Sequence, residues 1–356
     1  MKILQKHLFD GLVRSWASVT VVLTAILIFS QLPIALNRAA TREIGTDILL
    51  KFVGWVSIAN LPVILPITVL LATVLAYGRF GSDGELGAMR TSGCSPGFLL
   101  VPVLWLAVPV AVLQAFLSLY LAPLSLCSAA AERGQAARTA ALAPVAAGKF
   151  QSYGAGVVLF VESVGADGAL KKVFIKRQTG DSIEVIVAER GQIEPRPDLD
   201  LVRVKLVSGR RYEGVPGRAD YRLVSFGTYA ASFAIPAIKA GCNRPDARPT
   251  TDLWTSNEPK ARAELNGRLG LPLMVLILAV LALTLSTTRP REGPYARLPL
   301  AIVVFFVYSF ATIGLTTFSS RNVVAGSVAF WSLHALVACV ALFAFWRMQR
   351  GGVASR

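Results

Sequence analysis

The sequence predicts an α+β membrane protein in which six transmembrane helices, split three and three, flank an inserted antiparallel β jelly roll. Six charge-free apolar stretches each reach the roughly 20 residues that a helix needs to cross a hydrocarbon core. A long polar segment with strand-like alternation separates the third stretch from the fourth. A mean hydropathy of +0.57, with 54% hydrophobic residues, is too high for a soluble chain of 356 residues. The stretches are Ser15–Leu36, Phe52–Gly78, Phe98–Leu121, Leu269–Thr288, Leu298–Ser320 and Asn322–Trp346.

These features divide the chain into three parts. Residues 1–121 hold the first three spans and a short helix at about 82–92, residues 122–268 hold the β domain, and residues 269–356 hold the last three spans. The first stretch is too long for the apolar core of a signal peptide, so it is expected to remain as a helix.

The lysine and arginine residues predict the orientation. The two tails and the short loops on their side carry most of these cations, whereas the opposite short loops hold only Arg38, Arg42, Lys51 and Arg321. By the positive-inside rule, both termini are expected in the cytoplasm and the β domain outside. Much of the net charge of +15 is then a topological signal, and no nucleic-acid partner is predicted.

The inserted segment alternates as half-buried strands do. In Leu201–Val207, Val204 and Leu206 fall on one face and Arg203 and Lys205 on the other. Similar short runs are separated by turns rich in glycine, proline and aspartate. Two interpretations stay open: a domain that only packs or binds a partner, or a groove whose apolar inner face carries a lipid chain.

The four cysteines do not form a framework by their spacing. Cys127 and Cys242 flank the inserted segment on the side expected to be oxidising, so a bridge between them is conceivable but not required. Cys94 falls in a loop expected in the cytoplasm, and Cys339 falls in the last stretch.

The usual catalytic signatures are absent from the sequence. It contains no Gly-x-x-x-x-Gly-Lys-Ser/Thr loop and no His-Glu-x-x-His, so neither ATP nor a catalytic metal is expected to bind the chain directly. Of the two histidines, His7 is expected in a solvated tail, and His334 is expected to make a hydrogen bond within the helix bundle. No enzyme activity is predicted.

The loop after the second stretch carries the most specific pattern, Arg79–Gly93. Ser82 and Glu85 have the spacing of a capping box, and Gly93 suits the left-handed position after a helix end. Asp83 and Glu85 would place negative charge in the first helical turn. Glu85 either caps its own helix or belongs to a coupling helix that docks into a cytoplasmic motor, and the pattern leaves both open.

Proline and polar residues inside the apolar stretches predict where the helices bend and how they pack against one another. Pro62 and Pro66 should bend the second helix, and each frees a backbone carbonyl that a neighbour can satisfy. Polar side chains recur at about helical spacing in the first and fifth stretches, a pattern more typical of helix–helix hydrogen bonding than of a cavity lining. These residues are Thr20, Thr24, Gln31, Ser309, Thr312 and Thr316.

Arg38 and Arg42 lie four residues apart just beyond the first stretch, and so they share a helix face. Most such pairs are solvated or touch lipid headgroups. A phosphate-bearing ligand drawn from the outer leaflet would meet them first.

Five motifs follow one another along nearly the whole chain: Leu61–Pro66, Arg79–Gly93, Gly148–Phe150, Glu264–Pro272 and Pro290–Ala296. With these motifs, the chain resembles the LptF/LptG permeases of the lipopolysaccharide exporter, and LptF more than LptG. Each motif is weak alone, but their order and their topological places make the set specific.

The resemblance implies a multi-pass subunit of the bacterial inner membrane with a periplasmic jelly roll. In that family the subunit pairs with its paralogue, here an LptG-like subunit, and an LptB-like ATPase dimer hydrolyses ATP below them. Lipopolysaccharide passes lateral gates on the first and fifth helices, enters the jelly roll and continues along an LptC/LptA-like bridge. Carried over by position, the ATPase-coupling candidates are Glu85, Arg90, Asp83 and Leu86, and the lipid-binding candidates are Arg38, Arg42, Thr24, Gln31, Ser309 and Thr312.

Two rival functions remain. A lipoprotein-releasing or mechanotransmission permease usually places its large domain after the first of four spans, which disagrees with the three-and-three split. A membrane scaffold would use the β domain only to recruit partners, and Glu85 would then be dispensable.

Overall fold

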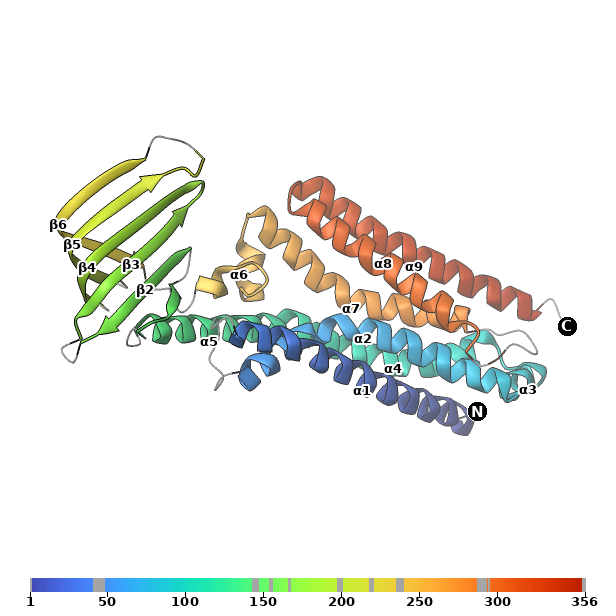
Figure 1. Ribbon diagram of the computed structural model, residues 1–356. Helices are drawn as coiled ribbons and strands as arrows, with labels where there is room; N and C mark the ends of the chain where they lie inside the picture. Colours follow the sequence, from blue (N-terminus) through green and yellow to red (C-terminus); the bar gives the residue numbers. More distant parts are fainter. Residues whose placement is uncertain are drawn as a thin grey trace. The chain divides into compact units, whose positions relative to one another are not determined.

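A computed structural model (Figure 1) describes residues 2–40, 49–142, 147–153, 156–165, 168–196, 201–217, 221–234, 240–286, 293 and 295–353. It confirms the expected class, with six helices long and apolar enough to cross a membrane and an antiparallel sheet between the third and the fourth. The chain folds as two compact units. The first contains the helices up to Ala129 and from Cys242 onward, and the second contains Ala130–Gly241 with the end of α1 from Arg38.

The first unit is a helix bundle centred on α7, which packs against α2, α4, α8 and α9 (Figure 1). Its spans run well beyond the apolar stretches, because polar flanks with good helix propensity continue the same backbone hydrogen bonding. The helices are α1 (Lys2–Ala40), α2 (Leu49–Ser82), α3 (Glu85–Thr91), α4 (Pro96–Phe116), the π-helix η1 (Leu117–Leu121), α5 (Ala122–Leu142), the 3₁₀-helix η3 (Ala240–Asn243), α6 (Thr250–Thr255), α7 (Pro259–Leu285), α8 (Leu298–Ser319) and α9 (Val323–Val353).

The proline pair in α2 is satisfied as the sequence predicts. Pro66 has no N–H to offer the carbonyl of Pro62, and Gln114 of α4 donates to that oxygen through Nε2 at 2.8 Å. Gln114 is fully buried, so this hydrogen bond replaces a missing backbone bond inside the bundle and joins the second span to the third.

The stripe of polar residues in the fifth span is used differently from the prediction. Thr312 and Thr316 in α8 donate back to the carbonyls of Tyr308 and Thr312, each at 2.8 Å, and so satisfy their own helix instead of a neighbour. His334 of α9 does make the expected bundle hydrogen bond, to the hydroxyl of Tyr308 in α8.

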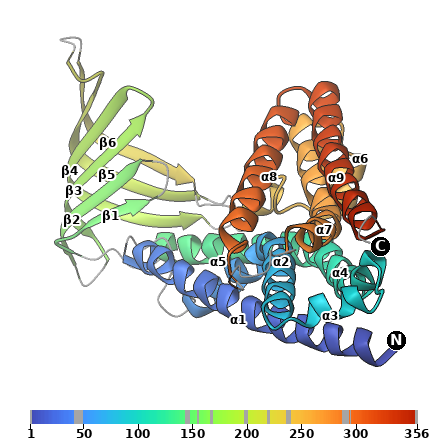
Figure 2. The ribbon, with the colours of Figure 1, turned by 90° about the vertical axis from the view of Figure 1, so that its right-hand side faces the viewer.

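The second unit is built on one antiparallel sheet in which strand follows strand in chain order (Figure 2). This up-and-down meander is simpler than the crossing connections of a jelly roll, because short turns lead from each strand to its neighbour. Gly168, Gly180 and Gly217 take positive φ in three of these turns, as their turn motifs predict. The strands are β1 (Phe150–Tyr153), β2 (Val157–Val164), β3 (Leu170–Thr179), β4 (Ser182–Arg196), β5 (Leu201–Gly214) and β6 (Arg222–Ala234).

One face of the sheet holds the core of the β domain. Val204 and Leu206 are buried there as predicted, beside Ile175 and Ile186. The alternation slips by one residue where β5 passes Ser208, whose φ is +56°, so that Leu206 and Gly209 point to the same face. Lys172 in β3 has a φ of +50° and marks the same slip there. Ser208 and Lys172 bend the sheet across several strands. The resulting curvature lets a single sheet bury one of its faces.

A buried carboxylate lies at one end of this face. Glu184 of β4 forms ion pairs with Arg177 of β3 and Arg211 of β5, and Arg211 also reaches Glu213 at 3.0 Å. Glu184 is only 8% exposed, whereas the two arginines are 40% and 27% exposed. The carboxylate is therefore the desolvated partner on which the cluster depends.

Replacing Glu184 by alanine should destabilise the β domain by about 2–3 kcal/mol, because two partly buried guanidinium groups lose their shared anion. Glu162→Ala is the matched control: Glu162 pairs with Lys172 at 2.9 Å, but both side chains are more than half exposed. Amide hydrogen exchange of β3 to β5 in the full chain measures the stability of the β domain in both variants. Equal protection in the two variants would contradict a structural role for the cluster.

Candidate functional site

The hairpin between the second and third spans forms a short helix, α3, at one end of the bundle. Gly84 takes a φ of +78° and separates α3 from α2, and Gly93 takes a φ of +84° after it, as predicted for a helix stop. Ser95 then begins α4, with its hydroxyl accepting from the N–H of Phe98.

The predicted capping box is wrong. α2 continues through Ser82 because Phe80 is buried in the bundle core, so Ser82 ends one helix instead of beginning the next. Its hydroxyl donates to the carbonyl of Arg79 at 2.9 Å. The helix expected at about 82–92 consequently begins at Glu85, and the Glu85 side chain is not used as a cap.

Two apolar residues anchor α3 to the bundle. Leu86 and Met89 are buried in the cluster that contains Leu8, Tyr77 and Phe80. Leu86, a coupling candidate, therefore faces inward and holds the helix in place. Asp83 is exposed in the turn, and the Arg90 side chain lies outside the described part of the structure.

Glu85 is held from α1. Its Oε2 lies 3.1 Å from Nε2 of His7, and the His7 ring packs against Phe80 with the ring centroids 5.7 Å apart. The Glu85 side chain is 37% exposed, so it can also meet a partner. His7 was expected to be solvated. The sequence gives no signal for this pair, because 78 positions separate the two residues.

The N-terminal turns of α1 are seated on α2 by close packing. Leu8, Gly11 and Leu12 are buried, and a Cβ on Gly11 would lie 2.4 Å from Cζ of Phe80. Trp16 donates from Nε1 to the hydroxyl of Thr68 at 3.0 Å. Beyond Leu12, Ala35 is the one buried residue among those that the structure describes in α1.

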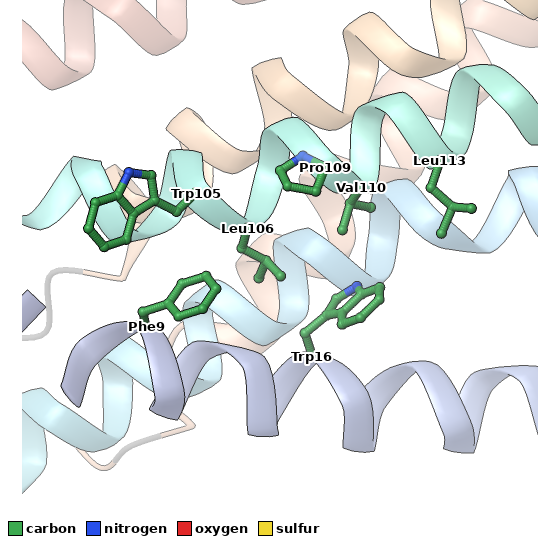
Figure 3. A pocket seen from close by; sticks show the side chains of 7 residues that line it. All are labelled: Phe9, Trp16, Trp105, Leu106, Pro109, Val110 and Leu113. Carbon is green, nitrogen blue, oxygen red and sulfur yellow. The ribbon is translucent and has the colours of Figure 1, made fainter. Parts of the chain in front are cut away.

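An apolar pocket of about 190 Å³ separates α1 from α4. Figure 3 shows Phe9 and Trp16 of α1 facing the α4 side chains across it. Because this contact is incompletely filled, α1 is held mainly at its first turns, by α2 and by Glu85. The lining residues are Phe9, Trp16, Trp105, Leu106, Pro109, Val110 and Leu113.

The lipid-binding candidates lie on the exposed helices. α1 and α8 are among the spans with the fewest buried residues. Thr24 of α1 and Ser309 of α8 are partly exposed, and Gln31 donates to the hydroxyl of Ser30 at 3.4 Å. Thr312 bonds within α8 as described, and Arg38 lies in the last turn of α1. Arg42 lies outside the described residues.

A second cluster, missed by the sequence analysis, surrounds Arg268 at the start of the fourth span. Its guanidinium is buried, with the residue 4% exposed. It donates to the carbonyls of Pro245, Asp246 and Arg248 at 3.0 Å and to the hydroxyl of Thr250 at 2.9 Å. Glu264, one helical turn earlier, accepts from its Nε at 2.9 Å. The Arg268 side chain thus holds in place the segment through which the chain returns from the β domain.

The same region is joined to the third span. Ser118 of η1 donates to the carbonyl of Arg268 at 3.1 Å, and the Thr250 hydroxyl donates to the carbonyl of Leu119. A disulfide links Cys127 of α5 to Cys242 of η3, which answers the question that cysteine spacing left open. The outgoing and returning segments are therefore clamped together beside α7.

Comparison with known proteins agrees with this architecture. The sequence profile described as "Lipopolysaccharide export system permease LptF/LptG" matches residues 6–347. The Lipopolysaccharide export system permease protein LptF of Escherichia coli K12 is 26% identical over 345 residues, which cover 96% of this chain and 93% of that protein. The LptF proteins of Escherichia coli O157:H7 and Shigella flexneri match to the same extent. The chain is a multi-pass membrane protein that belongs to the LptF/LptG family of lipopolysaccharide export system permeases.

Proposed function

We propose that the chain is the LptF-type subunit of an ATP-driven exporter that takes lipopolysaccharide from the outer leaflet of the inner membrane. In this proposal it pairs with an LptG-like subunit and has no ATPase activity of its own. An LptB-like ATPase dimer binds at α3, and the β domain passes the lipid to an LptC/LptA-like bridge. The observation that carries the proposal is the partly exposed Glu85 carboxylate on a short helix that Leu86 and Met89 anchor in the bundle core.

The disulfide supports the orientation. From Pro96 to Cys127, α4, η1 and α5 form an unbroken helical path of about 47 Å, which exceeds a hydrocarbon core of about 30 Å. The Glu85 helix and the Cys127–Cys242 bridge therefore belong on opposite sides of the membrane. Disulfides persist in oxidising compartments such as the bacterial periplasm, which supports a cytoplasmic position for Glu85, beside the proposed ATPase.

The cargo path rests on position and chemistry. The apolar face of the sheet around Val204 and Leu206 suits acyl chains. Arg38, at the end of α1, suits a lipid phosphate. Thr24 and Gln31 of α1, with Ser309 and Thr312 of α8, belong to the two helices that would form the gates.

Reversing Glu85 to lysine should abolish association of the LptB-like ATPase and lower export by about tenfold or more, because like charges facing each other cost several kcal/mol. Ser92→Lys adds a cation to the same hairpin at an exposed position beyond α3 and is expected to preserve both. Co-purification of the ATPase with the full chain and its LptG-like partner, followed by lipopolysaccharide release from proteoliposomes, measures the effects. Unchanged association and export in Glu85→Lys would favour the scaffold interpretation.

A further inference from the structure

The contact between His7 of α1 and Glu85 of α3 depends on the packing of the His7 ring as well as on its hydrogen bond. The ring contacts Phe80, and Phe80 also fills the space left by Gly11. His7 is 56% exposed, so burial does not account for its placement. The ring is fixed by α2 and presents Nε2 to Glu85.

The hydrogen bond uses only one side of the Glu85 carboxylate. His7 meets Oε2, and within the part of the chain that the structure describes Oε1 accepts no hydrogen bond. A carboxylate held through one oxygen keeps its other oxygen for a guanidinium or ammonium group. The arrangement fixes the side chain before a partner arrives, which reduces the entropy lost on binding.

The same contact joins α3 to a helix that is loosely packed elsewhere. α1 faces α4 across the apolar pocket, and two polar contacts join its N-terminal half to other helices, His7 to Glu85 and Trp16 to Thr68. A displacement of α3 would therefore reach the N-terminal turn of α1 through the His7–Glu85 contact.

We propose that His7 is a positioning residue that presents the Glu85 carboxylate to a cationic side chain of the ATPase and couples the movement of α3 to α1. This inference rests on the proposed function and deepens it. It assigns a role to a residue of the first span, outside the hairpin that docks.

Three substitutions separate the hydrogen bond from the packing. His7→Phe keeps a ring against Phe80 but removes the donor, His7→Ala removes both, and His7→Gln keeps an N–H donor. Binding of the LptB-like ATPase to the full chain with its LptG-like partner should weaken about three- to tenfold in His7→Phe and His7→Ala, the range for one partly exposed hydrogen bond to a charged group. His7→Gln should restore binding to within about twofold. Lys6→Ala, at the neighbouring exposed position, should bind like the unmodified chain.

A double-mutant cycle tests whether His7 acts through Glu85. In a Glu85→Ala background, where binding is already weaker, His7→Phe should weaken it no further. A His7→Phe chain that binds the ATPase as well as the unmodified chain, while Glu85→Lys still fails, would overturn this inference and leave the proposed function intact. An additional loss in the Glu85→Ala background would also overturn it. Normal binding by Glu85→Lys would instead remove the proposed function.

Discussion

Replacing Arg268 by methionine should destabilise the full chain by about 3–5 kcal/mol, because the buried guanidinium donates to three carbonyls, a hydroxyl and a carboxylate. Methionine fills a similar volume, so the loss reflects hydrogen bonds and not a cavity. Hydrogen exchange of residues 244–253 and the thermal unfolding of the chain in detergent measure the effect.

Two variants sharpen this result. Arg268→Lys retains the charge but cannot form the planar fork, and it should show most of the same loss. Arg262→Met removes an arginine from the exposed face of the same helix, where its side chain donates to Asn257 at 2.9 Å, and should change stability by about 0.5 kcal/mol or less. Equal unfolding of Arg268→Met and Arg262→Met would show that the clamp around Arg268 contributes nothing.

Two glycines in neighbouring spans should respond to alanine with opposite signs. A Cβ on Gly326 of α9 would lie 2.2 Å from Cα of Ser319 at the end of α8. The obstacle is backbone, so the hairpin between α8 and α9 must open, and Gly326→Ala should cost about 2–3 kcal/mol. A Cβ on Gly314 of α8 meets nothing within 4 Å, and Gly314→Ala should stabilise the helix by about 0.5–1 kcal/mol.

Thermal unfolding of the full chain in one detergent compares the two glycine variants directly. The expected result is a lower midpoint for Gly326→Ala and an equal or higher midpoint for Gly314→Ala. A stabilising effect of Gly326→Ala would mean that α8 and α9 approach less closely than the structure indicates.

The sequence was sufficient to predict the spans, the β domain and several local features, because these depend on residues that are neighbours in the chain. Hydropathy located all six helices, and the alternation of Leu201–Val207 identified the buried face of β5. The freed carbonyl of Pro62 was predictable from Pro66, although its donor, Gln114, was not. The positive φ of Gly93 followed from its position after a short helical run.

The misses have one physical cause, which is that each depends on contacts between distant residues. Ser82 looked like a cap, but the burial of Phe80 extends α2 past it. His7 is exposed as expected, but its hydrogen-bond partner lies in another hairpin and was not predicted. The Glu264–Pro272 motif gave no hint of the carbonyls to which Arg268 donates. The slip at Ser208, which has a matching position at Lys172 in β3, has no signal in the sequence of β5 alone.

The Cys127–Cys242 bond closes a covalent ring over a sequence separation of 115 residues. A protease that cuts once between these residues opens the ring but leaves a single molecule, which divides only after reduction. A force on the sheet would reach the helix bundle at this bond, where the outgoing and returning segments are joined. Both segments would then share the load, so the returning segment around Arg268 would not bear it alone.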